Sequence, residues 1–187
     1  MRSARSSRVL SANLKNFKER KYRPMFHSAS GKEMTINEIA DRIIQYMMED
    51  INASYEIMVG TDSQTHKETK MVEIIAVHRK GLGGIFFHNT DYIPRVRNLK
   101  QKINEETSRS LIVANTLLDA LEFPLLEAGY LVDDLDVTFQ IHCDIGKYGK
   151  TNELIKEIVS WVTSQGYICM IKPDSYVASG IADKYSK

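Results

Sequence analysis

Hydrophobic residues recur at helical spacing in four stretches of the chain. The first stretch follows the capping box Thr35-Ile-Asn-Glu38, in which a hydroxyl and a carboxylate can satisfy the free N–H groups of a first helical turn. Pro124 and Gly166 are typical helix terminators. The pattern therefore predicts helices over 36–49, 98–121, 152–165 and 175–185.

Short apolar runs, rich in β-branched and aromatic residues, predict five strands. They cover residues 55–60, 71–79, 85–90, 136–144 and 167–172. The first three are joined by short connections, which is typical of an antiparallel meander. A helix precedes each of the last two, as in βα units with parallel strands. We expect an α/β fold with a mixed five-stranded sheet, the fourth and fifth strands parallel to the first, flanked by helices and with an extra N-terminal helix.

Composition places the chain among ordinary soluble globular proteins. Of its 187 residues, 43% are hydrophobic and 26% are charged. No apolar run approaches the roughly 20 residues needed to span a bilayer, so no membrane partner is expected. Cys143 and Cys169 fall in predicted strands, which favours reduced core thiols and a cytoplasmic location.

Positive charge is concentrated at the N-terminus. Residues 1–23 carry eight basic side chains and one acidic one, a charge of +7, and the rest carries −6 because the whole chain is +1. This segment can be an arm that contacts nucleic-acid phosphates, a disordered start that happens to be basic, or an organelle transit peptide. We divide the chain into a flexible basic arm, 1–30, and one domain, 31–187.

Two aspartates fall at the ends of predicted strands. Asp62 follows the strand over 55–60, and Asp144 ends the strand over 136–144. Ligands collect beyond the carboxyl ends of parallel strands, so these carboxylates are expected to face each other across one crevice. Two like charges at short range are costly unless a cation lies between them. An isolated aspartate at such a position more often forms a turn or caps a helix.

The order of these elements and acids resembles the ribonuclease H superfamily. Four motifs narrow the likeness to the bacterial YkuK-type family, predicted to be nuclease-like but without a settled activity. They are Gly60-Thr-Asp-Ser-Gln64, Ile103-Asn-Glu-Glu-Thr-Ser108, His142-Cys-Asp-Ile-Gly146, and Lys172-Pro-Asp-Ser-Tyr176 followed by Ala182-Asp-Lys-Tyr185. The resemblance covers about residues 30–187.

The resemblance implies a ligand set for divalent metal. Asp62 and Asp144 match the two strand aspartates, and Glu106 matches the helix acid better than Glu105 does. Asp183 matches the last acid, with Asp174 as the alternative, although an N-cap role also suits Asp174.

With Mg²⁺ or Mn²⁺, such a set would hydrolyse phosphodiester bonds of RNA, DNA or a hybrid. On this hypothesis Asp62 bridges two metal ions, Glu106 and Asp144 hold one, and Asp183 or Asp174 holds the other. The alternative function is a non-catalytic ribonuclease-H-like module that binds nucleic acid or protein.

Several basic residues follow the strands that carry the aspartates. His66, Lys67, Lys147 and Lys150 are candidates to guide a nucleic-acid substrate, or are ordinary loop charges. The run Gly146-Lys-Tyr-Gly-Lys-Thr151 resembles a nucleotide-binding P-loop, but Asp144 stands where that pattern requires glycine, and a carboxylate would repel phosphate. Thr151 is instead expected to cap the following helix.

Overall fold

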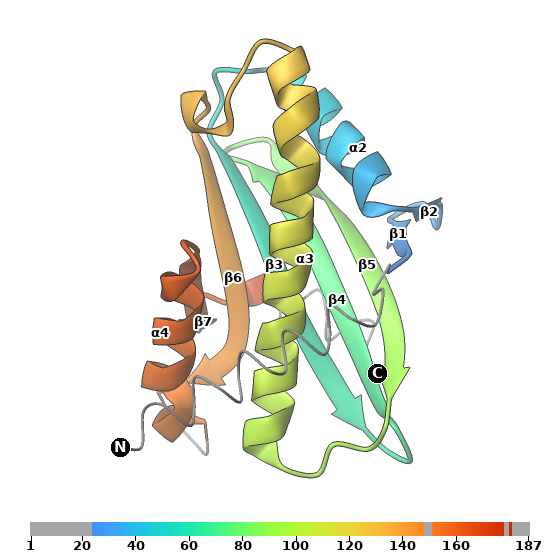
Figure 1. The fold of residues 1–187 in the computed structure, drawn as a ribbon, viewed down its shortest axis with the longest axis vertical. Coiled ribbons are helices and arrows are strands. Elements are labelled where there is room, and N and C mark those ends of the chain that lie inside the picture. The colour runs from blue at the N-terminus through green and yellow to red at the C-terminus, as the bar shows by residue number, and fades with distance from the viewer. Residues whose placement is uncertain (1–23, 148–150, 178–179, 181–187) are drawn as a thin grey trace.

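The computed structural model describes residues 24–147, 151–177 and 180, and it contains one seven-stranded sheet with helices packed against it (Figure 1). The strands are β1 Phe26–Ser28, β2 Glu33–Met34, β3 Tyr55–Thr65, β4 Thr69–Arg79, β5 Gly83–Ile93, β6 Val137–Gly146 and β7 Ile168–Lys172. The helices are α2 Ile36–Met48, α3 Leu99–Glu127 and α4 Ile155–Ser164, with 3-10 turns η1 Val132–Asp134 and η2 Asn152–Leu154.

The sheet has the predicted mixed topology but two more strands than predicted. Its order is β2-β1-β5-β4-β3-β6-β7. Strands β3, β4 and β5 form the antiparallel meander, whereas β6 runs parallel to β3 and β7 parallel to β6. The additional strands β1 and β2 have three and two residues, too few to show a period of two, and they lie on the β5 side of the sheet. Residues 26–28, which fall in the expected arm, thus form a strand that pairs with β5.

One face of the sheet packs against all three helices and forms the main core. Alternate residues of the strands, such as Ile57, Val59 and Ile75, point to this face, where they meet Leu117 of α3 and Ile158 of α4. Figure 1 shows α3 crossing this face diagonally, with α2 and α4 on either side. The predicted capping box is present at α2, where the Thr35 N–H donates to Glu38 at 2.8 Å and the Glu38 N–H donates to Thr35 at 3.3 Å.

Helix α3 continues past the proline that was expected to end it. Pro124 lies inside the last turns, and the helix ends at Glu127. Proline removes one hydrogen bond from a helix interior. Leu125, which is 2% exposed, extends the buried stripe of Leu117 and Leu121 by one more turn. Its burial offsets the lost hydrogen bond, and this packing could not be read from the proline alone.

The segment after β6 also differs from the expectation at Thr151. This residue stands before η2, but its side chain makes no capping hydrogen bond to the helix. Its hydroxyl instead accepts a hydrogen bond from the Gly146 N–H at 3.1 Å and closes the loop back onto the end of β6. The helix that follows therefore begins as a 3-10 turn rather than at a capped α-helical start.

The opposite face of the sheet carries a smaller apolar cluster. It contains Met58, Val72, Ile74 and Ala76, which are covered in part by Val177 after β7. The expected helix over 175–185 lies mostly outside the described residues. Among the helices that the structure describes, none combines the length and apolar character needed for a bilayer span.

The packing of α3 predicts that two of its leucines contribute very differently to the stability of the protein. Leu117 is fully buried, whereas Leu126 is 59% exposed. We expect Leu117→Ala to lower the free energy of unfolding by about 2–5 kcal/mol, because it removes buried methyl groups and leaves a cavity. Leu126→Ala should change it by less than about 0.5 kcal/mol. Urea unfolding followed by circular dichroism measures both, and equal losses would contradict the assigned packing of α3.

Candidate functional site

The candidate site lies where two parallel strands stop pairing. The β3–β6 ladder runs from Tyr55↔Val137 to Gly60↔His142, although both strands continue beyond that pair. The β6–β7 pairing is also irregular between His142 and Gly146. Asp62 and Asp144 each stand two residues past the last β3–β6 pair. The structure thus gives them equivalent positions beside the opening between the strands, although Asp62 is inside the long strand β3 rather than after its end.

Asp144 has a buried carboxylate oxygen that is paired with a lysine. Its Oδ1 atom is buried and lies 2.7 Å from the Lys172 Nζ atom, an ion pair between β6 and the last residue of β7. At this separation the ammonium group is the partner of the Oδ1 atom and neutralises its charge.

Glu106 enters the site from the first half of α3. It is 6% exposed, accepts a hydrogen bond from the Ser63 hydroxyl at 2.7 Å, and lies 3.6 Å from the Lys102 Nζ atom. Burial raises the pKa of Glu106 to about 8, against the lowering effects of Lys102 and Ser63. The negative charges of Asp62 and Asp144 raise the pKa further. Burial is therefore the main reason that Glu106 keeps its proton near neutral pH in the metal-free site.

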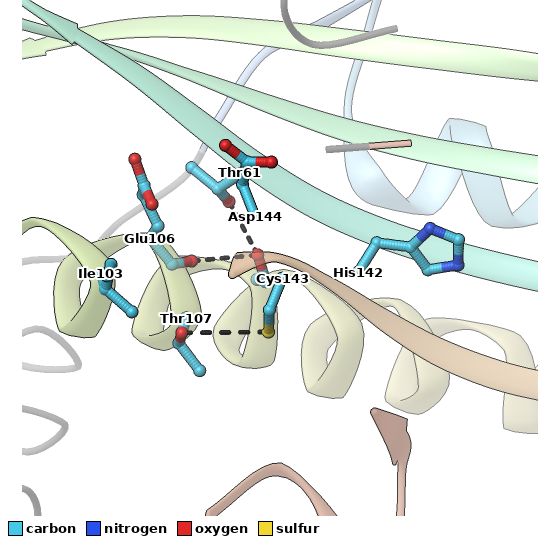
Figure 2. A pocket seen from close by; sticks show the side chains of 8 residues that line it. Thr61, Ile103, Glu106, Thr107, His142, Cys143 and Asp144 are labelled. Carbon is cyan, nitrogen blue, oxygen red and sulfur yellow. Dashed lines mark hydrogen bonds between the residues drawn. The ribbon is translucent and has the colours of Figure 1, made fainter. Parts of the chain in front are cut away.

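Hydroxyl groups form the wall between α3 and the strands. The Ser110 hydroxyl lies 2.8 Å from the Thr61 hydroxyl and donates to the Glu106 carbonyl at 2.9 Å. Figure 2 shows Glu106 and Asp144 beside Thr61, with His142 pointing away from them. The crevice that these residues line leaves no room for a water-sized sphere. An ion could enter only after side-chain movement, for which the Lys102 and Lys172 chains are suited because both are partly exposed at 31% and 49%.

Glu105, the alternative helix acid, belongs to a different cluster. Its carboxylate lies 3.1 Å from the Arg109 Nε atom. The buried Arg109 also pairs with Glu73 of β4 at 3.0 Å and with Asp91 of β5 at 2.9 Å. This network ties α3 to two strands and sets the rotation of the helix. It thereby turns Glu106 toward β3, where Ser63 donates to its carboxyl group.

The expected ligand set is only partly assembled. Asp62, Glu106 and Asp144 are close enough for the charges of both aspartates to act on the Glu106 pKa. Asp174 is exposed in the turn after β7, and Asp183 lies outside the described residues. Within the part of the chain that the structure describes, no group of three or more His, Cys, Asp or Glu side chains has the spacing to hold a metal ion. Instead, Glu106 and Asp144 each pair with a lysine.

His142 is not a candidate ligand. Its Nε2 atom hydrogen-bonds Gln140 at 3.1 Å, and its Nδ1 atom accepts from the Val177 N–H at 3.3 Å. Burial lowers the pKa of His142 to about 4, so the ring is neutral near pH 7. His142 lies on the face of the sheet that carries Val177, away from α3. Cys143 and Cys169 are free thiols, as expected.

Sequence reasoning did not identify three side chains that contact the carboxylates. Lys102 precedes Glu106 by four residues, a helical spacing that could have shown the pair. Ser63 lies one residue after Asp62, and its role follows from alternation once β3 is known to extend to Thr65. Lys172 contacts Asp144 through an irregular β6–β7 register, for which the sequence carries no signal.

The proposed guide residues are only partly described. His66 and Lys67 are exposed at the β3–β4 turn, and Lys147 is exposed after β6. Lys150 lies outside the described residues. His66 and Lys67 therefore lie beyond the end of β3, the strand that carries Asp62.

Comparison with known proteins agrees with this architecture. The family model described as "Ribonuclease H-like" matches residues 38–187. A protein of Bacillus subtilis (strain 168), named "Uncharacterized protein YkuK", is 34% identical over 168 residues, which cover 87% of this chain and 97% of that protein. No solved structure matches the chain significantly. The family model and the relative together show that the chain belongs to the ribonuclease H-like family and is of the YkuK type.

Proposed function

We propose that this protein is a divalent-metal-dependent nuclease that hydrolyses phosphodiester bonds of nucleic acid. Asp62, Glu106 and Asp144 are the proposed core ligands, and Asp183 or Asp174 would supply the fourth acid. Membership of the ribonuclease H-like family supports a nucleic-acid substrate and the use of divalent metal. The related protein is uncharacterised, so the proposal depends on the site itself.

The observation that carries the proposal is that Glu106 and Asp144 line one crevice, where each carboxyl group is paired with a lysine. Carboxylates are the hard oxygen ligands that Mg²⁺ and Mn²⁺ prefer. Lys102 and Lys172 now provide the positive charge that these groups require. The residues fit a metal ion because a divalent cation would supply the same positive charge in place of the two ammonium groups.

When bound, the metal ions would supply an activated water and neutralise charge on the scissile phosphate. The residues of the protein would position the metal ligands and supply charge at the site. Ser63 orients the Glu106 carboxylate by a hydrogen bond, and the Arg109 network holds α3 in place beneath it. Lys102 and Lys172, once displaced from the carboxylates, would contact phosphate oxygens of the substrate in this proposal. Catalysis then rests on preorganised electrostatics rather than on a covalent intermediate.

The lysine pairs also support a second candidate, a non-catalytic binding module. An ammonium group can neutralise a carboxylate permanently, and a site in that state would bind no metal. Direct titration separates the two functions: calorimetry with Mn²⁺ detects binding to a metal site and detects none in a module whose carboxylates stay paired with lysine.

Replacing Asp144 by asparagine should abolish metal-dependent cleavage. Asp144→Asn keeps the shape of the side chain but removes the charge that holds a cation, so we expect cleavage of labelled RNA, DNA and hybrid substrates to fall at least about 100-fold. The control is Asp119→Asn, which removes an exposed carboxylate near the far end of α3 and should cut like the wild type. Full activity of Asp144→Asn in Mg²⁺ or Mn²⁺ would contradict the proposed role.

Glu106 should make the stability of the metal-free protein depend on pH. Its ordinary pKa is 4.5 and its folded pKa is about 8, so the unfolded chain loses this proton at lower pH than the folded protein does. The contribution of Glu106 to stability is complete below pH 4.5 and is lost as the pH rises through about 8. Glu106→Gln cannot lose a proton, so its free energy of unfolding should rise relative to the wild type between these values.

Urea unfolding in EDTA at several pH values measures this effect. Glu122→Gln, a change at an exposed position of α3, is the control and should follow the wild type throughout. A constant difference between Glu106→Gln and the wild type from acid to alkaline pH would show that Glu106 titrates normally.

A further inference from the structure

A polar hollow lies directly beside the carboxylates. Its volume is about 520 Å³, and its lining includes Ser63 and Thr65 of β3, Arg95 and Arg97 of the β5–α3 connection, and Lys102 of α3. Lys102 joins this hollow to the carboxylate site, because its Nζ atom donates to the Ser63 carbonyl at 2.5 Å and lies 3.6 Å from Glu106. Lys102 therefore stands between the hollow and the carboxylates.

The connection that carries the two arginines is held in place. Val96, between them, is 8% exposed, and its N–H donates to the Thr69 hydroxyl at 2.8 Å. The Thr69 hydroxyl is itself 3.1 Å from the Thr65 hydroxyl. With Val96 anchored inward, Arg95 and Arg97 are both exposed, and both line the hollow. The site is thus built on the β3–β4 hairpin rather than on a free loop.

The hollow carries three positive charges, and only that of Lys102 is paired with an acid among the described residues. Arg95 and Arg97 form no ion pair with any residue in the described part of the chain. The N-terminus of α3, whose free N–H groups favour anions, opens at Asn98 and Leu99 on the same wall. Exposed Lys67 stands at the adjacent hairpin turn. Guanidinium groups bind phosphate oxygens with two parallel hydrogen bonds.

We infer that Arg95 and Arg97 bind the sugar–phosphate backbone of a nucleic-acid strand and lead it to the carboxylates. The inference rests on the proposed nuclease function, because that function is the reason for the nucleic acid to run toward the carboxylates. It adds to that function a contact that holds the substrate outside the reacting centre. These contacts are to phosphates, so they confer affinity without sequence preference. Lys102 would touch the phosphate between the arginines and the crevice.

The test is binding of fluorescent 20-nucleotide single strands of RNA and DNA, measured by anisotropy in EDTA over a range of salt concentrations. For Arg95→Ala/Arg97→Ala we expect about tenfold weaker binding at low salt. The slope of log K against log salt should become shallower by about 1.5, because two phosphate contacts are lost. Arg95→Lys/Arg97→Lys, which keeps both charges, should retain most of the slope.

The matched control is Lys32→Ala/Lys80→Ala, which removes two exposed positive charges on other turns. Lys80 follows the end of β4 opposite to Thr69. The control should bind like the wild type apart from a small change in slope. Equal losses in the arginine variant and the control, an unchanged slope in the arginine variant, or no binding of either strand by the wild type would each overturn the inference.

Cleavage assays on the same variants separate this inference from the nuclease proposal. A wild type that binds through Arg95 and Arg97 but never cuts, with any divalent metal, would leave the phosphate site standing and remove the nuclease function. A protein that cuts equally well with and without the two arginines would keep the nuclease function and remove the phosphate site.

Discussion

The site depends on one constraint: carboxylates gathered in a buried crevice need positive charge. Strands β3 and β6 stop pairing after Gly60↔His142, and Asp62 and Asp144 follow at the same distance on each strand. Glu106 approaches from α3, and its pKa is raised by burial and by both aspartates. Lys102 and Lys172 supply part of the compensating charge, from the helix and from the end of β7. The point where the two parallel strands separate is thus the place where carboxylates gather, and these carboxylates need positive charge beside them.

The rest of the fold holds this crevice in shape. The apolar core between the sheet and the three helices fixes the position of α3. The buried Arg109, paired with Glu73 and Asp91, fixes its rotation, and the Ser110–Thr61 hydrogen bond joins it to β3 beside the site. Phosphodiester hydrolysis by metal ions needs ligands held in this way, since small displacements of a ligand cost much of the rate. The hollow around Arg95 and Arg97 is part of the same scaffold and adjoins the carboxylates through Lys102.

Much of this arrangement could be predicted from the sequence because it depends on local periodicity. The meander, the parallel direction of β6 and β7 and the capping box at Thr35 all follow from spacing along the chain. The choice of Glu106 as a ligand is a prediction from the resemblance. What could not be predicted depends on contacts between distant residues. β1 and β2 are too short to show a pattern, α3 passes Pro124 because Leu125 is buried, and Lys172 meets Asp144 through an irregular register. The role of Asp183 as fourth acid is still a prediction from resemblance.

The most direct test of the metal site is a crystal structure of the protein grown with Mn²⁺, with diffraction recorded at an energy where manganese scatters anomalously. The account predicts an anomalous peak at about 2.0–2.3 Å from the Asp144 Oδ1 atom, with Asp62 or Glu106 as a second ligand and the Lys172 ammonium displaced. An Asp144–Lys172 ion pair that persists at 2.7 Å in saturating Mn²⁺, with no anomalous peak at the crevice, would contradict it.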